Sequence, residues 1–401
     1  MKRSLTFQYS LHQLAYWGAA AGIMSFATAF LLEKGFPAGQ VGTLMACGSI
    51  LSCITQPLLA SLADRSRTSA LKRFLILLSG ACTVCFGLLL LPGLPSGLFA
   101  LLYLCGVWLF DSMIPLMNSV CVYYTRMGWH LNFGVARGIG SLSYSLAALT
   151  LGYIIQSLGP DWMIRVILIL LPLCIAIVLT YPKVMEQLPD GREYNTLPVQ
   201  TPCSPVEFLF RYRWYCCSLI GILLLGMFHA MTENYLIAIM ERLGGNSSHV
   251  GVALFIATAA EAVILMFLNP IRRKISDHWL LRIAGFSFFV KSVLFLAAPN
   301  IPFIYAAQLL QMTSYAFLSP VQVYYANEKV APQDMVKGQA FITASYTLGC
   351  ATGNFTGGQL MQHFGILAIL ISGVVIAAAG TLVLLLTLER KDAWFTQYTV
   401  S

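Results

Sequence analysis

The stretch Trp162–Tyr181 reads WMIRVILILLPLCIAIVLTY and decides the fold. It holds one charged residue, Arg165, and a run of this length can cross the hydrocarbon core of a bilayer as a helix. Similar apolar runs recur along the chain. They lie at 7–32, 38–63, 73–92, 97–125 and 138–158, and at 213–240, 248–270, 279–298, 302–326, 338–362 and 365–389. We therefore expect an all-α membrane protein with twelve transmembrane helices, numbered 1 to 12 along the chain, in two six-helix bundles.

The composition excludes most other classes of protein. Of 401 residues, 58% are hydrophobic and 10% are charged, whereas soluble chains average about 45–50% apolar and about 25% charged residues. Soluble enzymes, nucleic-acid-binding proteins and secreted disulfide scaffolds are excluded on this ground. The net charge of +8 therefore needs an explanation other than nucleic-acid binding.

The distribution of the basic residues supplies that explanation. If the N-terminus is cytoplasmic, 19 of the 24 Lys and Arg residues fall in cytoplasmic segments, and the outside loops hold only Lys34, Arg165 and Arg242. Such an excess sets the orientation of membrane proteins. We expect both termini to lie in the cytoplasm. The expected location of the protein is the plasma membrane, which is the inner membrane of a bacterial cell.

The chain divides at a long, proline-rich polar stretch. The expected units are an N-terminal bundle at 1–181, a cytoplasmic linker at 182–212, a C-terminal bundle at 213–389 and a cytoplasmic tail at 390–401. The sequences of the two expected bundles resemble one another, as in transporters built from internal repeats. The matches are Gln56-Pro57 with Asn269-Pro270, Val122-Tyr123-Tyr124 with Val323-Tyr324-Tyr325, and 132–144 with 334–346.

Two motifs carry a resemblance. The run Asp64-Arg65-Ser66-Arg67 between helices 2 and 3, with twelve helices and a central linker, resembles the major facilitator superfamily of transporters. The run 132–137, NFGVAR, followed by Gly140-Ser141 and Tyr144, resembles the branch of the lactose permease, phenylpropionate permease and nucleoside–proton symporters. This resemblance implies that Arg137 binds the solute and that Tyr144 stacks on its ring.

The chain departs from that branch in helices 4 and 10. Asn118 stands where the lactose permease has a sugar-binding glutamate. Gln308, Gln311 and Ser314 stand where it has a lysine, a histidine and a proton-carrying glutamate. Two amides one turn apart need hydrogen-bond partners in hydrocarbon, so Gln308 and Gln311 are expected to bind solute, with Tyr346 on helix 11.

Five charged residues fall inside the expected membrane helices, where each charge is costly. They are Asp111, Arg137, Glu233, Glu261 and Lys291. Three acids against two bases leave one carboxylate without a fixed partner. Such a group can bind and release a proton, as a proton-coupled carrier requires.

Helices 4 and 5 are expected to form the solute site. Asp111 and Asn118 share one helical face, and Arg137, Ser141 and Tyr144 share another. If the faces meet, the arginine fork can bind a hydroxylated or anionic solute. The alternative is that Asp111 and Arg137 form a structural ion pair.

Helices 7 to 9 are expected to carry the proton coupling. His229 and Asn234 lie near Glu233 on helix 7 and are expected to contact solute. By resemblance, Glu261 matches the helix-8 acid that couples sugar to protons in the lactose permease, and Lys291 stands where that permease has an arginine. Either glutamate then carries the proton while Lys291 adjusts its affinity. The alternative is that Lys291 neutralises one glutamate permanently.

The leading interpretation is a monomeric secondary transporter that takes up a sugar, glycoside or nucleoside-like solute with protons. No metal or nucleotide motif is seen, so no cofactor is expected, and protons are the expected coupling ion. The first alternative is a proton-coupled exporter of amphipathic drugs or lipids. A membrane enzyme would carry clustered catalytic motifs, and a receptor would carry a large extramembrane domain; neither is seen.

Overall fold

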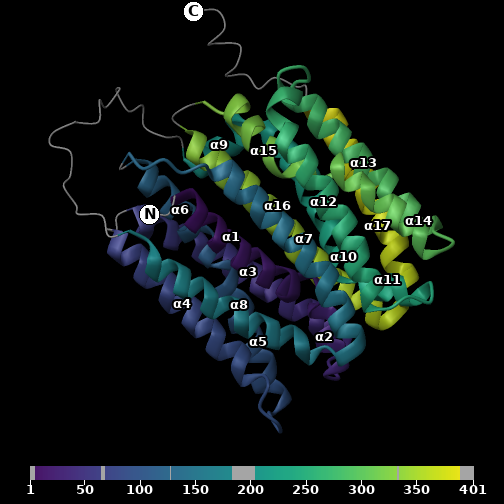
Figure 1. The fold of residues 1–401 in the computed structure, drawn as a ribbon. Coiled ribbons are helices and arrows are strands. Elements are labelled where there is room, and N and C mark those ends of the chain that lie inside the picture. Colours follow the sequence, from purple (N-terminus) through teal and green to yellow (C-terminus); the bar gives the residue numbers. More distant parts are fainter. Residues whose placement is uncertain (1–4, 65–67, 127, 183–203, 332–333, 389–401) are drawn as a thin grey trace, which may run out of the picture.

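The structure is a computed structural model that describes residues 5–64, 68–126, 128–182, 204–331 and 334–388. All regular elements in these ranges are helical (Figure 1). The first half holds α1 (Leu5–Ala20), the π-helical turn η1 (Ala21–Ser25), α2 (Ala27–Glu33), α3 (Ala38–Asp64), α4 (Thr68–Leu88), α5 (Ser96–Asp111), α6 (Met113–Arg126), α7 (Phe133–Leu158) and α8 (Asp161–Thr180).

The second half repeats this pattern after a short helix. It holds α9 (Pro205–Arg211), α10 (Arg213–Asn234), α11 (Leu236–Arg242), α12 (Ser247–Arg272), α13 (Asp277–Ala297), α14 (Ile301–Gln308), the 3₁₀ turn η2 (Leu309–Met312), α15 (Tyr315–Lys329), α16 (Met335–Phe364) and α17 (Ile366–Thr387). Most of the expected linker and the whole expected tail lie outside the described residues, and the division into two bundles stays a prediction.

The described residues contain nine helices long and apolar enough to cross a membrane, and one bent pair of the same character. The bent pair, Leu5–Ser25 and Ala27–Glu33, turns by 50°. The two other expected spans are also helical. One, at 302–326, is broken into α14, η2 and α15; the other corresponds to the continuous α16, which is rich in Gly, Thr and amide residues. The chain is thus a multi-pass membrane protein, while the count of twelve and the cytoplasmic termini stay predictions.

Exposed apolar side chains on the outer helices agree with a lipid-facing surface. Leu77 on α4, Ile169 on α8 and Val375 on α17 are each more than 60% exposed. Surfaces of this kind are unusual on soluble monomers and are covered by hydrocarbon in membrane proteins.

Helix breaks fall at matching places in the two halves. The first expected span breaks at Phe26 and the seventh at Tyr235; the fourth breaks at Ser112 and the tenth over 309–314. The residues beside these breaks, Ser25, Asp111, Asn234 and Gln311, all line one cavity. Breaks in membrane helices free backbone groups and are tolerated where they border a cavity or are buried in protein. The repeat seen in the sequence is therefore present in the helix breaks as well.

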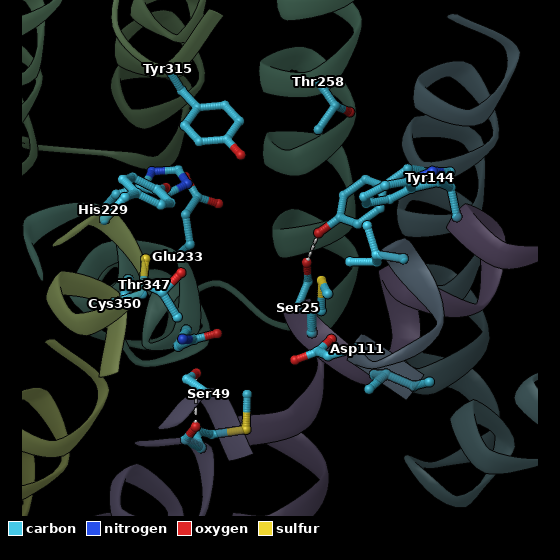
Figure 2. A pocket seen from close by; sticks show the side chains of 18 of the residues that line it. Ser25, Ser49, Asp111, Tyr144, His229, Glu233, Thr258, Tyr315, Thr347 and Cys350 are labelled. Atoms are coloured by element: carbon cyan, nitrogen blue, oxygen red, sulfur yellow. Dashed lines mark hydrogen bonds between the residues drawn. The ribbon is translucent and has the colours of Figure 1, made fainter. Parts of the chain in front are cut away.

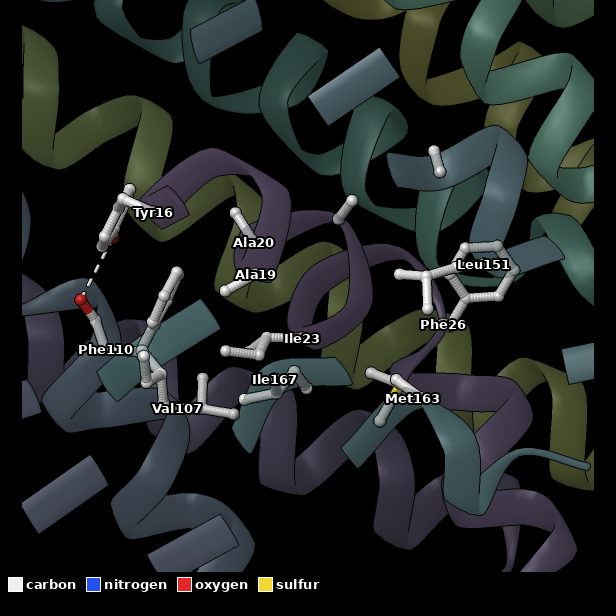
Figure 3. Packing of buried hydrophobic residues seen from close by; sticks show 14 of the residues in the cluster. Tyr16, Ala19, Ala20, Ile23, Phe26, Val107, Phe110, Leu151, Met163 and Ile167 are labelled. Atoms are coloured by element: carbon white, nitrogen blue, oxygen red, sulfur yellow. Dashed lines mark hydrogen bonds between the residues drawn. The ribbon is translucent and has the colours of Figure 1, made fainter. Parts of the chain in front are cut away.

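The interior of the first half is packed by large apolar and aromatic side chains (Figure 3). Tyr16 on α1 stacks on Phe110 of α5 with ring centres 4.3 Å apart, and its hydroxyl donates to the Phe110 carbonyl at 3.1 Å. Both side chains are fully buried. This contact fixes α1 against the end of α5, where Asp111 follows.

Glycines bring the two halves together at one end of the molecule. α3 packs on α16 and α7 packs on α12, so both contacts join the first half to the second (Figure 1). A Cβ added at Gly42 would lie 2.3 Å from the Asn354 carbonyl oxygen, and one at Gly152 would lie 2.9 Å from the Gly251 Cα. Only glycine permits such an approach, as at other membrane helix interfaces. We call this the closed end, defined by the start of α3 and the end of α16.

Candidate solute-binding cavity

A cavity of about 440 Å³ lies between the two halves. Its volume falls within the range of about 300–1,000 Å³ usual for small-molecule sites. Helices of both halves supply its lining (Figure 2). The polar and aromatic members are Trp17, Ser25, Ser49, Ser52, Gln56, Asp111, Arg137, Ser141, Tyr144, His229, Glu233, Asn234, Thr258, Glu261, Gln311, Tyr315, Tyr346, Thr347 and Asn354.

The expected row on α7 faces this cavity. Arg137 donates through Nη1 to Ser141 Oγ at 3.1 Å, which leaves other guanidinium N–H groups directed elsewhere. The Tyr144 hydroxyl is hydrogen-bonded to Ser25, beside the break in α1. A helical repeat therefore places a cation, a hydroxyl and an aromatic ring on one wall.

Trp17 completes this wall and was missed in the sequence. The guanidinium carbon of Arg137 lies 4.0 Å from the centre of the Trp17 ring, a cation–π contact. The Trp17 indole N–H donates to Gln13 Oε1 at 2.8 Å, and Gln13 Nε2 donates to the Tyr9 hydroxyl at 2.9 Å. Gln13 and Tyr9 are buried, so this chain of hydrogen bonds fixes the indole beneath the arginine.

The second half provides a buried ion pair. Lys291 Nζ lies 3.2 Å from Glu233 Oε1 and donates to Gln311 Oε1 at 2.8 Å. The Lys291 side chain is fully buried behind the cavity, while that of Glu233 keeps 19% exposure to it. Among the sequence-predicted residues, these three therefore come together as a single cluster.

An aromatic wall stands beside this cluster (Figure 2). The His229 ring stacks on Tyr315 with centres 4.7 Å apart and planes at 10°, and Tyr346 lies 6.1 Å from Tyr315. Stacked or offset rings form surfaces on which a planar or apolar ring can pack. The stacking partner Tyr315 belongs to the turn that follows the break in the tenth span.

Two amides border the cavity toward the closed end. Asn234, at the end of α10, donates to the Asn354 side chain on α16. The hydroxyl of Tyr235 donates to the Asn354 backbone carbonyl at 3.3 Å. Because Asn354 also contacts Gly42 across the halves, the bottom of the cavity and the closed end share the same residues.

The three acidic side chains of the cavity have different surroundings. Glu233 pairs with Lys291, and Glu261 lines the cavity without forming an ion pair within the described residues. Asp111, at the end of α5, receives one long hydrogen bond of 3.5 Å from Ser52 Oγ. Within the described residues Asp111 forms no ion pair with Arg137, so the alternative of a structural pair between them does not describe this structure.

Two predicted residues lie away from the main cavity. Asn118 is exposed and lines a second cavity of about 200 Å³, which shares Trp17 and Arg137 with the first. Gln308 is fully buried at the end of α14, outside both linings, and its amide has no hydrogen-bond partner within the described residues. The break that follows Gln308 turns Gln311, but not Gln308, toward the cavity.

Comparisons with known proteins agree with the fold. The model of the MFS_1 like family matches residues 6–371, and the chain belongs to this family of major facilitator transporters. An uncharacterized transporter, YwbF, from Bacillus subtilis (strain 168) is 24% identical over 385 residues, which cover 94% of this chain and 92% of that protein. The maltose permease of Geobacillus stearothermophilus is 22% identical over 379 residues, covering 93% of this chain and 92% of that protein.

A solved structure with the same fold is the nucleoside transporter NupG. It superposes with a TM-score of 0.78 at 14% identity, covering 98% of this chain and all of that one. At this identity the likeness concerns the fold alone. The predicted membership of the major facilitator superfamily is confirmed, and the protein is a membrane transporter.

Proposed function

We propose that the protein takes up a small polar solute, a sugar, glycoside or nucleoside-like molecule, together with protons by alternating access. The observation that carries the proposal is the charged lining of the cavity: three carboxylates, the guanidinium of Arg137 and aromatic rings from both halves meet there, with Lys291 buried behind Glu233. The names of two similar proteins, a maltose permease and a nucleoside transporter, support solutes of this class.

Arg137 and the aromatic rings are proposed to hold the solute. The guanidinium N–H groups of Arg137 can donate hydrogen bonds to hydroxyl or carbonyl oxygens of the solute. The cation–π contact with Trp17 holds the guanidinium group in place. Tyr144 on one side and the His229–Tyr315 stack on the other can pack against a sugar or base ring.

The Glu233–Lys291 pair and Glu261 are proposed to couple the solute to protons. Protonation of Glu233 would release Lys291 to Gln311 alone, and protonation of Glu261 would remove the negative charge that acts on Arg137. Either change alters the net charge that the cavity encloses within the membrane interior while the two halves move past one another. Charge enclosed there is costly.

Transport into right-side-out vesicles tests the proposal. Radiolabelled maltose and uridine are supplied with an inward proton gradient, and uptake is compared with vesicles in which an ionophore collapses the gradient. We expect gradient-driven accumulation of at least one solute, and its loss in Glu233→Gln or Glu261→Gln. Wild-type accumulation in both variants would overturn the coupling role, and movement only outward would favour the exporter.

A further inference from the structure

We infer that Asp111 is a separate proton-binding site, whose carboxyl group carries a proton when the cavity is closed on both sides. This inference rests on the proposed proton-coupled transport and adds a site in the first half to the glutamates of the second. It starts from the position of Asp111 at the break between α5 and α6, on the cavity wall (Figure 2).

The Asp111 carboxyl group receives few hydrogen bonds from the described residues. Among the described residues, its Oδ1 is buried without a hydrogen-bond partner, and Oδ2 receives only the 3.5 Å contact from Ser52. Gln56, the nearest amide, donates instead to the Asp111 backbone carbonyl at 3.1 Å. An ionised carboxylate normally collects several donors or a cation, and here it has neither.

No cation of the described chain compensates the charge. The titratable groups on which the charge of Asp111 acts are Tyr16 from α1, Cys82 from α4 and Tyr103 from its own helix. None of these three side chains can carry a positive charge. The α3 side chains in contact, Ser52 and Gln56, are neutral.

The two cations at or behind the cavity are held by other groups. Lys291 pairs with Glu233, while Arg137 donates to Ser141 and lies over the Trp17 ring. Within the described residues Asp111 therefore has neither cation as an ion-pair partner. An unpaired charge of this kind is costly in a membrane interior, so the group must take up a positive charge before the halves close over it.

A proton suits the site better than a metal ion. Hard cations take about six or more oxygen ligands. In the part of the chain that the structure describes, Ser52 is the only side chain bonded to the carboxyl group, and no group of three His, Cys, Asp or Glu residues is placed to bind a metal. A proton needs no such shell and leaves an O–H group that can donate to solute or water in the cavity.

Infrared difference spectroscopy of the purified full-length protein tests this without a known solute. A pH jump in the wild type should produce a carbonyl band of a protonated carboxyl group that shifts in deuterated water. Asp111→Asn should lose this band. Asp161→Asn should keep it, because Asp161 is an exposed acid paired with Lys34 at 2.6 Å.

Two further measurements keep the test independent of folding. Wild type labelled with ¹³C-aspartate should show a shifted band, and Ser52→Ala should move the band by removing its hydrogen bond. An unchanged band in Asp111→Asn, no effect of the label, or replacement of the proton by sodium at constant pH would overturn the inference. If the band is unchanged in Asp111→Asn while proton-driven uptake still fails in Glu233→Gln or Glu261→Gln, the inference fails and the proposed function stands.

Discussion

The guanidinium group of Arg137 on α7 lies 4.0 Å above the indole ring of Trp17 on α1. The contact joins two helices of the first half at the cavity wall, and the Tyr9–Gln13–Trp17 hydrogen bonds hold it from below. A cation–π contact fixes the arginine while leaving N–H groups for a ligand. The position of the arginine therefore depends on α1 as much as on its own helix.

Replacement of Arg137 should weaken solute binding strongly. Arg137→Ala is expected to weaken the affinity of any solute that binds by more than about tenfold, or about 1.4 kcal/mol, because it removes the only cation that the described residues place on this wall. Arg137→Lys should recover little, since a lysine lacks the planar fork. Thermal-shift titration with maltose and uridine measures the effect.

A second arginine provides the control. Arg165 on α8 also sits over an indole, that of Trp162 at 4.8 Å, but it does not line the cavity. Arg165→Ala should leave the affinity unchanged. Equal binding by wild type and Arg137→Ala would place the solute site elsewhere.

Breaking the buried ion pair should destabilise the protein strongly. Lys291→Met leaves Glu233 charged beside an apolar side chain, a change that costs about 3–5 kcal/mol in buried pairs. The double variant Glu233→Gln with Lys291→Met should recover most of this loss, because no charge remains. Melting temperatures in detergent report the difference.

The exposed pair Lys34–Asp161 supplies the comparison for this prediction. Its side chains are 32% and 47% exposed, so Lys34→Met should cost no more than about 1 kcal/mol. If the double variant melts as low as Lys291→Met alone, the loss arises from packing and not from the unpaired charge.

A side chain at Gly152 should open the closed end. The Cβ of Gly152→Val would lie 2.7 Å from the Ser247 carbonyl oxygen, so α7 and α12 must separate. Hydrogen exchange should then become faster at the end of α7 and the start of α12. Gly80→Val on α4 is the control, because nothing lies within 4 Å of a Cβ there; equally slow exchange in both variants would show that these glycines do not hold the halves together.

Tyr212 should stabilise the start of the second half. Its hydroxyl donates to Asp334 Oδ2 at 2.9 Å, and burial together with Asp334 raises the pKa of Tyr212 above its ordinary value. The phenol therefore keeps its proton at all physiological pH values. Tyr212→Phe leaves a buried carboxylate short of a donor and should cost about 1–3 kcal/mol in a denaturation experiment, whereas an unchanged midpoint would mean that other groups already satisfy Asp334.

Most of the fold was predictable because apolar runs of sufficient length have few other solutions. The expected span at 162–181 coincides with α8 almost to the residue, and the α7 row of Arg137, Ser141 and Tyr144 does face the cavity. The helix breaks were not predicted. They depend on packing between helices, such as the hydrogen bond of Ser25 with Tyr144, and leave no local composition signal.

The site was predictable where one helix carries several of its residues, and less so between helices. Helical spacing identifies His229 and Glu233, but it cannot show that Trp17 meets Arg137 or that Asp111 stays unpaired among the described residues. Those facts depend on which helices are neighbours. Gln308 was predicted to bind solute because, on an unbroken helix, it would share a face with Gln311, one turn away. The helix is broken after Gln308, so the two amides do not share a face.

Proton movement that accompanies solute across proteoliposomes is the most direct test of coupled transport. Purified protein is reconstituted with a pH-sensitive dye inside the vesicles, and maltose or uridine is added outside without an imposed gradient. We predict that at least one solute acidifies the lumen with wild-type protein and that neither does so with Arg137→Ala. Uptake of a solute by the wild type with no change in the internal pH would contradict proton-coupled symport.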